Sequence, residues 1–178
     1  MDIYTESYKR EISGIEDDIE RGVPTGVNST HYGLGILNRA SMIVIGLCSL
    51  VEALLYEIAS KEEQKNSFKI DDLKGTGLVR NQTYLSRTGI VDFGKIPSWG
   101  DFKKIYIIRN ALVHSYGGLV ESTDMTKVSD ALAHFKFKNV LIGGRRIRMT
   151  SESLHKTISV VETTIESLKR VSSIGEDS

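Results

Sequence analysis

Residues 40–59 read ASMIVIGLCSLVEALLYEIA, and this apolar stretch decides the fold. Between Met42 and Leu55 the residues are apolar on nearly every side of a helix, which is typical of a helix at the centre of a bundle, because a surface helix needs a polar face. Glu52 and Glu57 interrupt the stretch, so the pattern favours a helix buried in protein over a membrane span. We predict that this central helix covers residues 31–61.

Further helices are predicted on both sides of the central one. Apolar residues recur at helical spacing near both ends of the chain. Serine, threonine and aspartate precede several of these segments, and their side chains can cap the exposed amides of a first helical turn. The predicted helices are an N-terminal helix within residues 1–22, a shorter helix from Asp71 or Asp72 to Ser86, a helix over 99–116 capped by Ser98 and ended by Gly117-Gly118, a short helix over 129–134, and a C-terminal helix over 151–171 capped by Thr150 or Ser151.

A β-hairpin is predicted over residues 135–149, just before the C-terminal helix. Phenylalanine alternates with lysine in its first half, and Gly143-Gly144 accepts the positive φ that a two-residue turn needs. Its bases form either a solvated edge kept from aggregating by charge or a surface that follows the phosphates of RNA. These bases, which no acid accompanies, are Lys136, Lys138, Arg145, Arg146 and Arg148.

Length and composition predict a single domain over residues 1–178. Lysine and arginine number 23, as do aspartate and glutamate, so the formal net charge of zero excludes a general attraction of the whole molecule to nucleic acid or membranes. The one cysteine forms no internal disulfide, and the first twenty residues are acidic and lack the apolar run of a signal peptide. We expect a cytoplasmic protein that has no membrane partner.

The segment IIRNALVHSY, residues 107–116, carries the most informative chemistry. Arg109 falls within the apolar arc of its helix and needs a partner, for which Glu52 is our candidate. Arg109 and His114 leave the helix axis about 140° apart, so either a long arginine curls toward a ligand or two such helices face each other. Arginine offers a fork of donors to phosphate oxygens and histidine can carry a proton, so the pair suits a phosphodiester, with Asn110 ordering it.

At these residues the sequence resembles the HEPN superfamily of small helical domains, many of them ribonucleases of toxin–antitoxin and phage-defence systems. The family's signature is an arginine, often followed by asparagine, and then a histidine after four to six residues; here it stands as Arg109-Asn-Ala-Leu-Val-His114. The resemblance covers residues 30–170 and implies a homodimer with a composite cleft, RNA cleavage without metal and 2′,3′-cyclic phosphate ends. Tyr116 matches an extended signature in toxins whose tyrosine is modified by the antitoxin; helix-end packing is the other role open to it.

The predicted fold is therefore mainly α: an antiparallel HEPN-like bundle of four to six helices with one β-hairpin inserted before the C-terminal helix. The predicted function is metal-independent endoribonuclease activity in a toxin–antitoxin or phage-defence type system, with RNA as substrate, no cofactor, and an antitoxin or inhibitor protein as a further partner. The alternative is a non-catalytic HEPN-like module that binds protein or nucleotide partners. His31, His134 and His155 have no cysteine or acid at the spacing of zinc ligands, so no metal site is expected.

Overall fold

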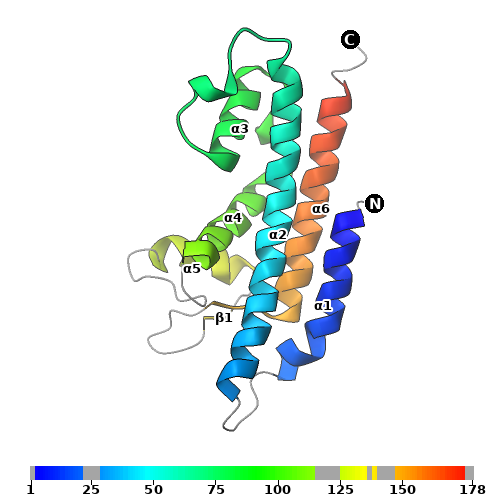
Figure 1. Ribbon diagram of the computed structural model, residues 1–178, viewed down its shortest axis with the longest axis vertical. Coiled ribbons are helices and arrows are strands. Elements are labelled where there is room, and N and C mark those ends of the chain that lie inside the picture. The colour runs from blue at the N-terminus through cyan, green and yellow to red at the C-terminus, as the bar shows by residue number, and fades with distance from the viewer. Residues whose placement is uncertain (1–2, 22–28, 115–124, 136–137, 140–146, 175–178) are drawn as a thin grey trace.

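The computed structural model describes residues 3–21, 29–114, 125–135, 138–139 and 147–174. Within these ranges it describes only the backbone of residues 18–21, 29–37, 125, 127, 138–139, 148 and 173–174. The described residues form six α-helices, which confirms the mainly α fold (Figure 1). The helices are α1 (Ile3–Arg21), α2 (Ser29–Glu63), α3 (Gly77–Arg87), α4 (Trp99–His114), α5 (Met125–His134) and α6 (Ser151–Ile174), with 3-10 helices η1 (Ile70–Asp72) and η2 (Phe93–Lys95).

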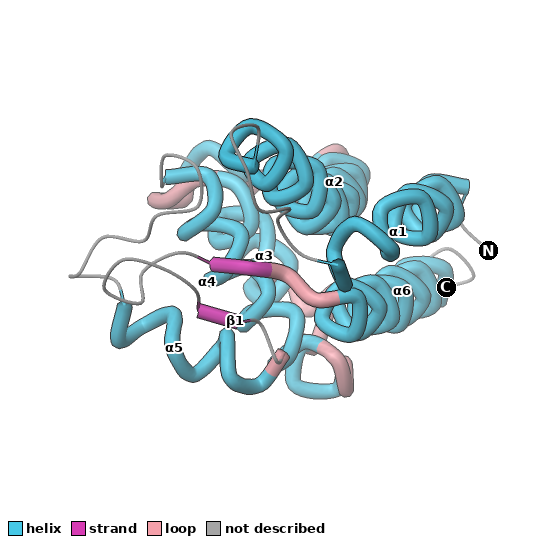
Figure 2. Tube along the Cα trace, turned by 90° about the horizontal axis from the view of Figure 1, so that it is seen from below, coloured by secondary structure: helices cyan, strands magenta, loops and turns pink. Residues whose placement is uncertain are grey.

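The three long helices α1, α2 and α6 pack side by side, with α4 and α5 on the other side of α2 in the view from below (Figure 2). Tyr8 of α1 lies against Gly46 of α2, and Lys9 of α1 pairs with Glu162 of α6. Figure 1 shows that α1 runs opposite to both of these neighbours. Helices α2 and α6 therefore run in the same direction. The expectation of a purely antiparallel bundle is wrong for this pair, because α3, α4 and α5 return the chain to the end where α2 begins.

The core is built from the apolar stripes of these helices. Ile12 and Ile15 of α1 are fully buried, as are Leu47 and Val51 of α2 and Val161 of α6. Each fully buried side chain of this size contributes about 1.5–3 kcal/mol of transfer free energy. Helix α1 thus belongs to the bundle and is not an appendage.

Helix α2 is buried on most sides, as predicted, but it keeps one exposed stripe. Met42 is 63% exposed and Tyr56 is 61% exposed. The part from Asn38 to Glu63 is long and apolar enough to cross a membrane by length and composition alone, a test that core helices of soluble proteins also pass. The prediction that this helix is enclosed on nearly every side is therefore only partly right.

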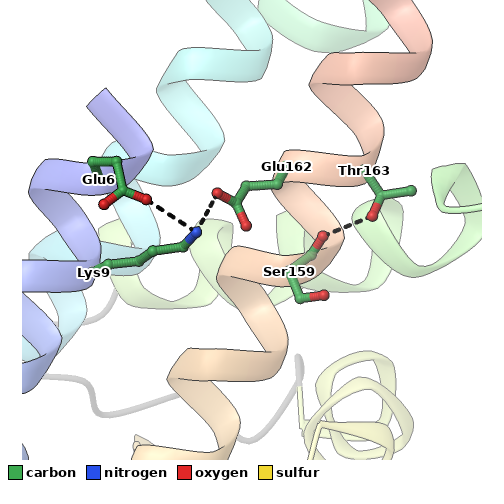
Figure 3. Close-up of polar contacts among 5 residues, drawn as sticks. All are labelled: Glu6, Lys9, Ser159, Glu162 and Thr163. Carbon is green, nitrogen blue, oxygen red and sulfur yellow. Dashed lines mark hydrogen bonds and ion pairs between the residues drawn. The ribbon is translucent and has the colours of Figure 1, made fainter. Parts of the chain in front are cut away.

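Polar contacts fix how α1 lies against α6. The Lys9 ammonium lies 3.3 Å from Glu6 Oε1 and 2.6 Å from Glu162 Oε1 (Figure 3). On α6 itself, the Thr163 hydroxyl donates to the backbone carbonyl of Ser159 at 2.9 Å. Since the ion pairs are partly exposed, they orient the helices more than they stabilise them.

One helix start and one helix cap differ from the predictions. Asp72 caps the short η1 by accepting from the Lys69 amide, and α3 begins only at Gly77, because Gly75 and Gly77 have positive φ angles of 101° and 52°. Ser98 precedes α4 as predicted, but its hydroxyl bonds Thr164 of α6 at 2.8 Å. Its side chain thus docks α4 onto α6.

The other predicted boundaries agree more closely. The Thr150 hydroxyl accepts from the Ser153 amide at 3.1 Å, so Thr150 is the residue that caps α6. Helix α5 covers the predicted helix over 129–134 and begins four residues earlier. Of the predicted hairpin, the described residues show two short antiparallel strands, β1 (Lys138–Asn139) and β2 (Ile147–Arg148), in the register Lys138↔Arg148. The predicted turn at Gly143-Gly144 lies outside the described residues, as does the Gly117-Gly118 stop.

Candidate functional site

Helix α4 presents Arg109 and His114 on two different sides. Their directions differ by roughly 140° around the helix axis, as the spacing requires. Arg109 lies on the side that packs against α2, and its side chain is 21% exposed. His114 is the last residue of α4 and is exposed. Among the described residues no hydrogen bond or ion pair joins the two side chains, so one chain does not by itself bring them together.

Glu52 of α2 is the charge partner of Arg109, as predicted. Arg109 Nη2 lies 3.5 Å from Glu52 Oε2, and both side chains are about four-fifths buried. The pairing meets a physical requirement, because an unpaired charge at this depth is strongly unfavourable. Arg109 also donates from Nη1 to Asn110 Oδ1 at 3.0 Å, whereas its buried Nε has no acceptor among the described residues.

Tyr106, one helical turn before Arg109, contacts both members of this ion pair. Its hydroxyl donates to Glu52 Oε1 at 2.7 Å. Its ring faces the Arg109 guanidinium, whose central carbon lies 5.4 Å from the ring centroid, within the range of a cation–π interaction. The two oxygens of Glu52 therefore have separate partners, the tyrosine hydroxyl and the arginine.

Gly77, the first residue of α3, lies close to the same carboxylate. Its φ of 52° is in the left-handed region that favours glycine. A Cβ at this position would lie 2.8 Å from Glu52 Oε1 and 3.7 Å from the Tyr106 hydroxyl. The start of α3 thus packs against Glu52 Oε1, and it can approach this oxygen so closely only because residue 77 has no side chain.

Burial raises the pKa of two neighbouring groups. Burial, followed by the hydrogen bond to Glu52, raises the pKa of Tyr106 to about 12. Burial also raises the pKa of the Cys48 thiol to about 12, against the opposing effect of the Arg109 charge. Both groups keep their protons near neutral pH, so Tyr106 is a hydrogen-bond donor and Cys48 is an unreactive core thiol.

Asn110 connects the buried part of the site with the exposed face of α4. It accepts from Arg109 and lies one turn before His114 on the same side of the helix. Ile107 is 39% exposed and Val113 is 45% exposed beside them. These apolar side chains are uncovered in the single chain, as expected if a second molecule covers this face.

The remaining predicted site residues cannot be placed around this cluster. Tyr116, Lys136, Arg145 and Arg146 lie outside the described residues. For Lys138 and Arg148 only the backbone is described, and the two residues pair across β1 and β2. The predicted phosphate-following surface therefore stays a prediction. Among the described residues no three histidine, cysteine or acidic side chains gather as metal ligands would.

Sequence reasoning missed Tyr106 and Gly77. The position of Tyr106 three residues before Arg109 was a usable signal, because residues at that spacing are neighbours on a helix surface. Nothing comparable identified Gly77, which lies 25 residues from Glu52 in the sequence and meets it only in the folded chain.

Comparison of the chain with protein-family models, curated proteins and solved structures finds no match. Chemically, the described residues offer a fixed guanidinium, about four-fifths buried, whose donors suit phosphate oxygens, and a solvent-exposed imidazole suited to proton transfer.

Proposed function

We propose that the protein is a HEPN-type endoribonuclease that cuts RNA without a metal ion in a cleft between two copies of the chain. The observation that carries the proposal is the setting of Arg109: Glu52, Tyr106 and Asn110 hold it, and His114 stands exposed at the end of the same helix. Arg109 and His114 lie five residues, or about one and a half helical turns, apart, so a second copy of the chain that covers this end of α4 could bring the two kinds of group to one phosphodiester.

The reaction uses the 2′-hydroxyl of the RNA as nucleophile. His114 accepts the proton of that hydroxyl while its oxygen attacks phosphorus, and Arg109 stabilises the negative charge on the five-coordinate phosphorus. The bond to the 5′-oxygen breaks, and this oxygen receives a proton from His114 of the partner subunit. The products are a 2′,3′-cyclic phosphate and a 5′-hydroxyl, and neither step needs a metal.

In this proposal a second copy completes the cleft, because Arg109 and His114 of one chain point in different directions. The exposed apolar side chains nearest His114 on α4 are Ile107 and Val113, and an association through this face would cover them. A role in a toxin–antitoxin or phage-defence type system, with an antitoxin or inhibitor as partner, belongs to the same proposal.

The direct test is a gel assay of purified protein with single-stranded RNA in EDTA. We expect cutting that survives chelation and is lost in Arg109→Ala and in His114→Ala. Arg87→Ala and His155→Ala are matched controls that remove an exposed arginine and an exposed histidine elsewhere, and both should retain activity. Absence of cutting by the unaltered protein, together with a monomer on light scattering, would favour the non-catalytic binding module.

Mixing experiments test the shared cleft. If each site needs both histidines, an equal mixture of wild-type and His114→Ala subunits contains about one quarter wild-type dimers and retains about a quarter of the activity. If each chain works alone, about half of the activity remains. The second result would refute the composite site while leaving nuclease activity intact.

A further inference from the structure

We propose that Tyr106 is a positioning residue that fixes the plane of the Arg109 guanidinium, both directly and through Glu52. The inference rests on the proposed nuclease function, because it assigns a role to Tyr106 at that same site. It concerns a side chain outside the Arg109–His114 signature itself.

The Tyr106 hydroxyl determines which oxygen of Glu52 is available to Arg109. It holds Oε1 at 2.7 Å, and Gly77 packs against the same oxygen. Oε2 therefore remains for Arg109 Nη2, at 3.5 Å. Without the hydroxyl the carboxylate can rotate and offer either oxygen, so the guanidinium loses its fixed partner.

The face of the Tyr106 ring contacts the guanidinium of Arg109. Arg109 lies over this ring at 5.4 Å, and Phe102 stands behind the ring with its centroid 6.3 Å away. Trp99 continues the row, 5.3 Å from Phe102, and contacts Phe93 of η2 at 4.4 Å. Trp99 and Phe102 are buried and Tyr106 is partly buried, so Tyr106 is the outer end of an aromatic row anchored in the core.

Few other groups fix the orientation of Arg109. Its Nε is buried with no acceptor among the described residues, so the guanidinium is held at its two Nη atoms and through its face. Among the residues that the structure describes, Asn110 is the one partner of Nη1, so a rotation about that contact is resisted mainly by Tyr106 and Glu52. The Tyr106 hydroxyl, whose pKa burial raises to about 12, is protonated over the whole neutral range and remains a donor.

Two substitutions separate the two contributions of Tyr106. Tyr106→Phe removes the hydroxyl and keeps the ring, and Tyr106→Leu removes both. Tyr84→Phe is the matched control: Tyr84 is fully buried and its hydroxyl donates to the Phe68 carbonyl at 3.2 Å, away from the site.

The first measurement does not depend on catalysis. The free energy of unfolding is compared for Tyr106→Phe, Glu52→Leu and the double variant, because leucine removes the acceptor of the Tyr106 hydrogen bond. Since the two residues share this hydrogen bond, the double variant should lose less stability than the sum of the two single losses. Tyr84→Phe combined with Glu52→Leu should show additive losses. Independent effects for the Tyr106 pair would overturn the inference.

The second measurement is RNA cleavage. We expect Tyr106→Phe to lower kcat about tenfold with KM changed less than about twofold, and Tyr106→Leu to lower kcat further, because a misplaced catalytic group affects the transition state more than substrate binding. Tyr84→Phe should leave kcat unchanged. If Tyr84→Phe and Tyr106→Phe lowered kcat equally, Tyr106 would stabilise the fold without positioning Arg109. If the unaltered protein cuts no RNA while the Tyr106–Glu52 coupling is found, the nuclease proposal fails and the positioning of Arg109 by Tyr106 stands.

Discussion

Replacing Gly77 by alanine tests whether the start of α3 holds Glu52 in place. The substitution acts in two ways. The φ of 52° at residue 77 is unfavourable for any residue with a Cβ, and that Cβ would lie 2.8 Å from Glu52 Oε1, so the carboxylate must move away from the Tyr106 hydroxyl. Gly89→Ala is a matched control, because Gly89 has a φ of 74° and nothing within 4 Å of an added Cβ.

The expected magnitudes follow from these two terms. A left-handed backbone costs a residue with a side chain about 1–2 kcal/mol. Alanine recovers about 0.4–1 kcal/mol of this by restricting the unfolded chain. Gly89→Ala should therefore lower the free energy of unfolding by about 0.5–1 kcal/mol. Gly77→Ala should lose about 1–2 kcal/mol more, because a hydrogen bond to a charged group contributes about 1.5–3 kcal/mol and is here weakened but not removed.

Urea denaturation followed by circular dichroism measures both variants on one scale. Repeating the comparison in a Tyr106→Phe background is the internal check, since the excess loss at Gly77 should shrink when the hydroxyl is already absent. Losses at Gly77 and Gly89 that agree within about 0.3 kcal/mol would refute the reasoning, because backbone strain alone would then account for Gly77.

Two further predictions concern the packing of α1. The hydroxyl of Ser151 lowers the pKa of Glu16 below its ordinary 4.5, so this contact stabilises the fold above that pH and its contribution is lost as the pH falls through the lowered value. Ser151→Ala should therefore be less stable than wild type in urea at about pH 7, with the difference shrinking as the pH falls below the ordinary pKa of the carboxyl group; a difference independent of pH would contradict this assignment. Gly46→Ala places a Cβ against the Tyr8 hydroxyl and should lower the free energy of unfolding by about 1–3 kcal/mol. Gly14→Ala is the control, because nothing lies within 4 Å of an added Cβ, and it should raise the free energy of unfolding by about 0.5–1 kcal/mol. Thermal melts compare the two variants, and a Gly46→Ala variant as stable as wild type would show that Tyr8 does not pack there.

The helices were predictable because each is encoded locally. The N-terminal helix was predicted within residues 1–22 and is found at Ile3–Arg21, and the C-terminal helix was predicted over 151–171 and is found at Ser151–Ile174. The apolar stripe of each helix can be recognised from residues three or four positions apart in the sequence. For the helix predicted to end at Ser86 only the start was wrong, because the two positive-φ glycines delay α3 until Gly77.

The sequence by itself determined that the chain is a helical protein with an arginine, an asparagine and a histidine on one helix, and it identified Glu52 as the acid that arginine would need. Only the tertiary structure decided that Tyr106 and Gly77 complete the setting of Arg109. Tyr106 and Glu52 are 54 positions apart, and their contact depends on how α3 and α4 pack on α2. Periodicity records which face of a helix is buried, but not which residue of another helix that face will meet.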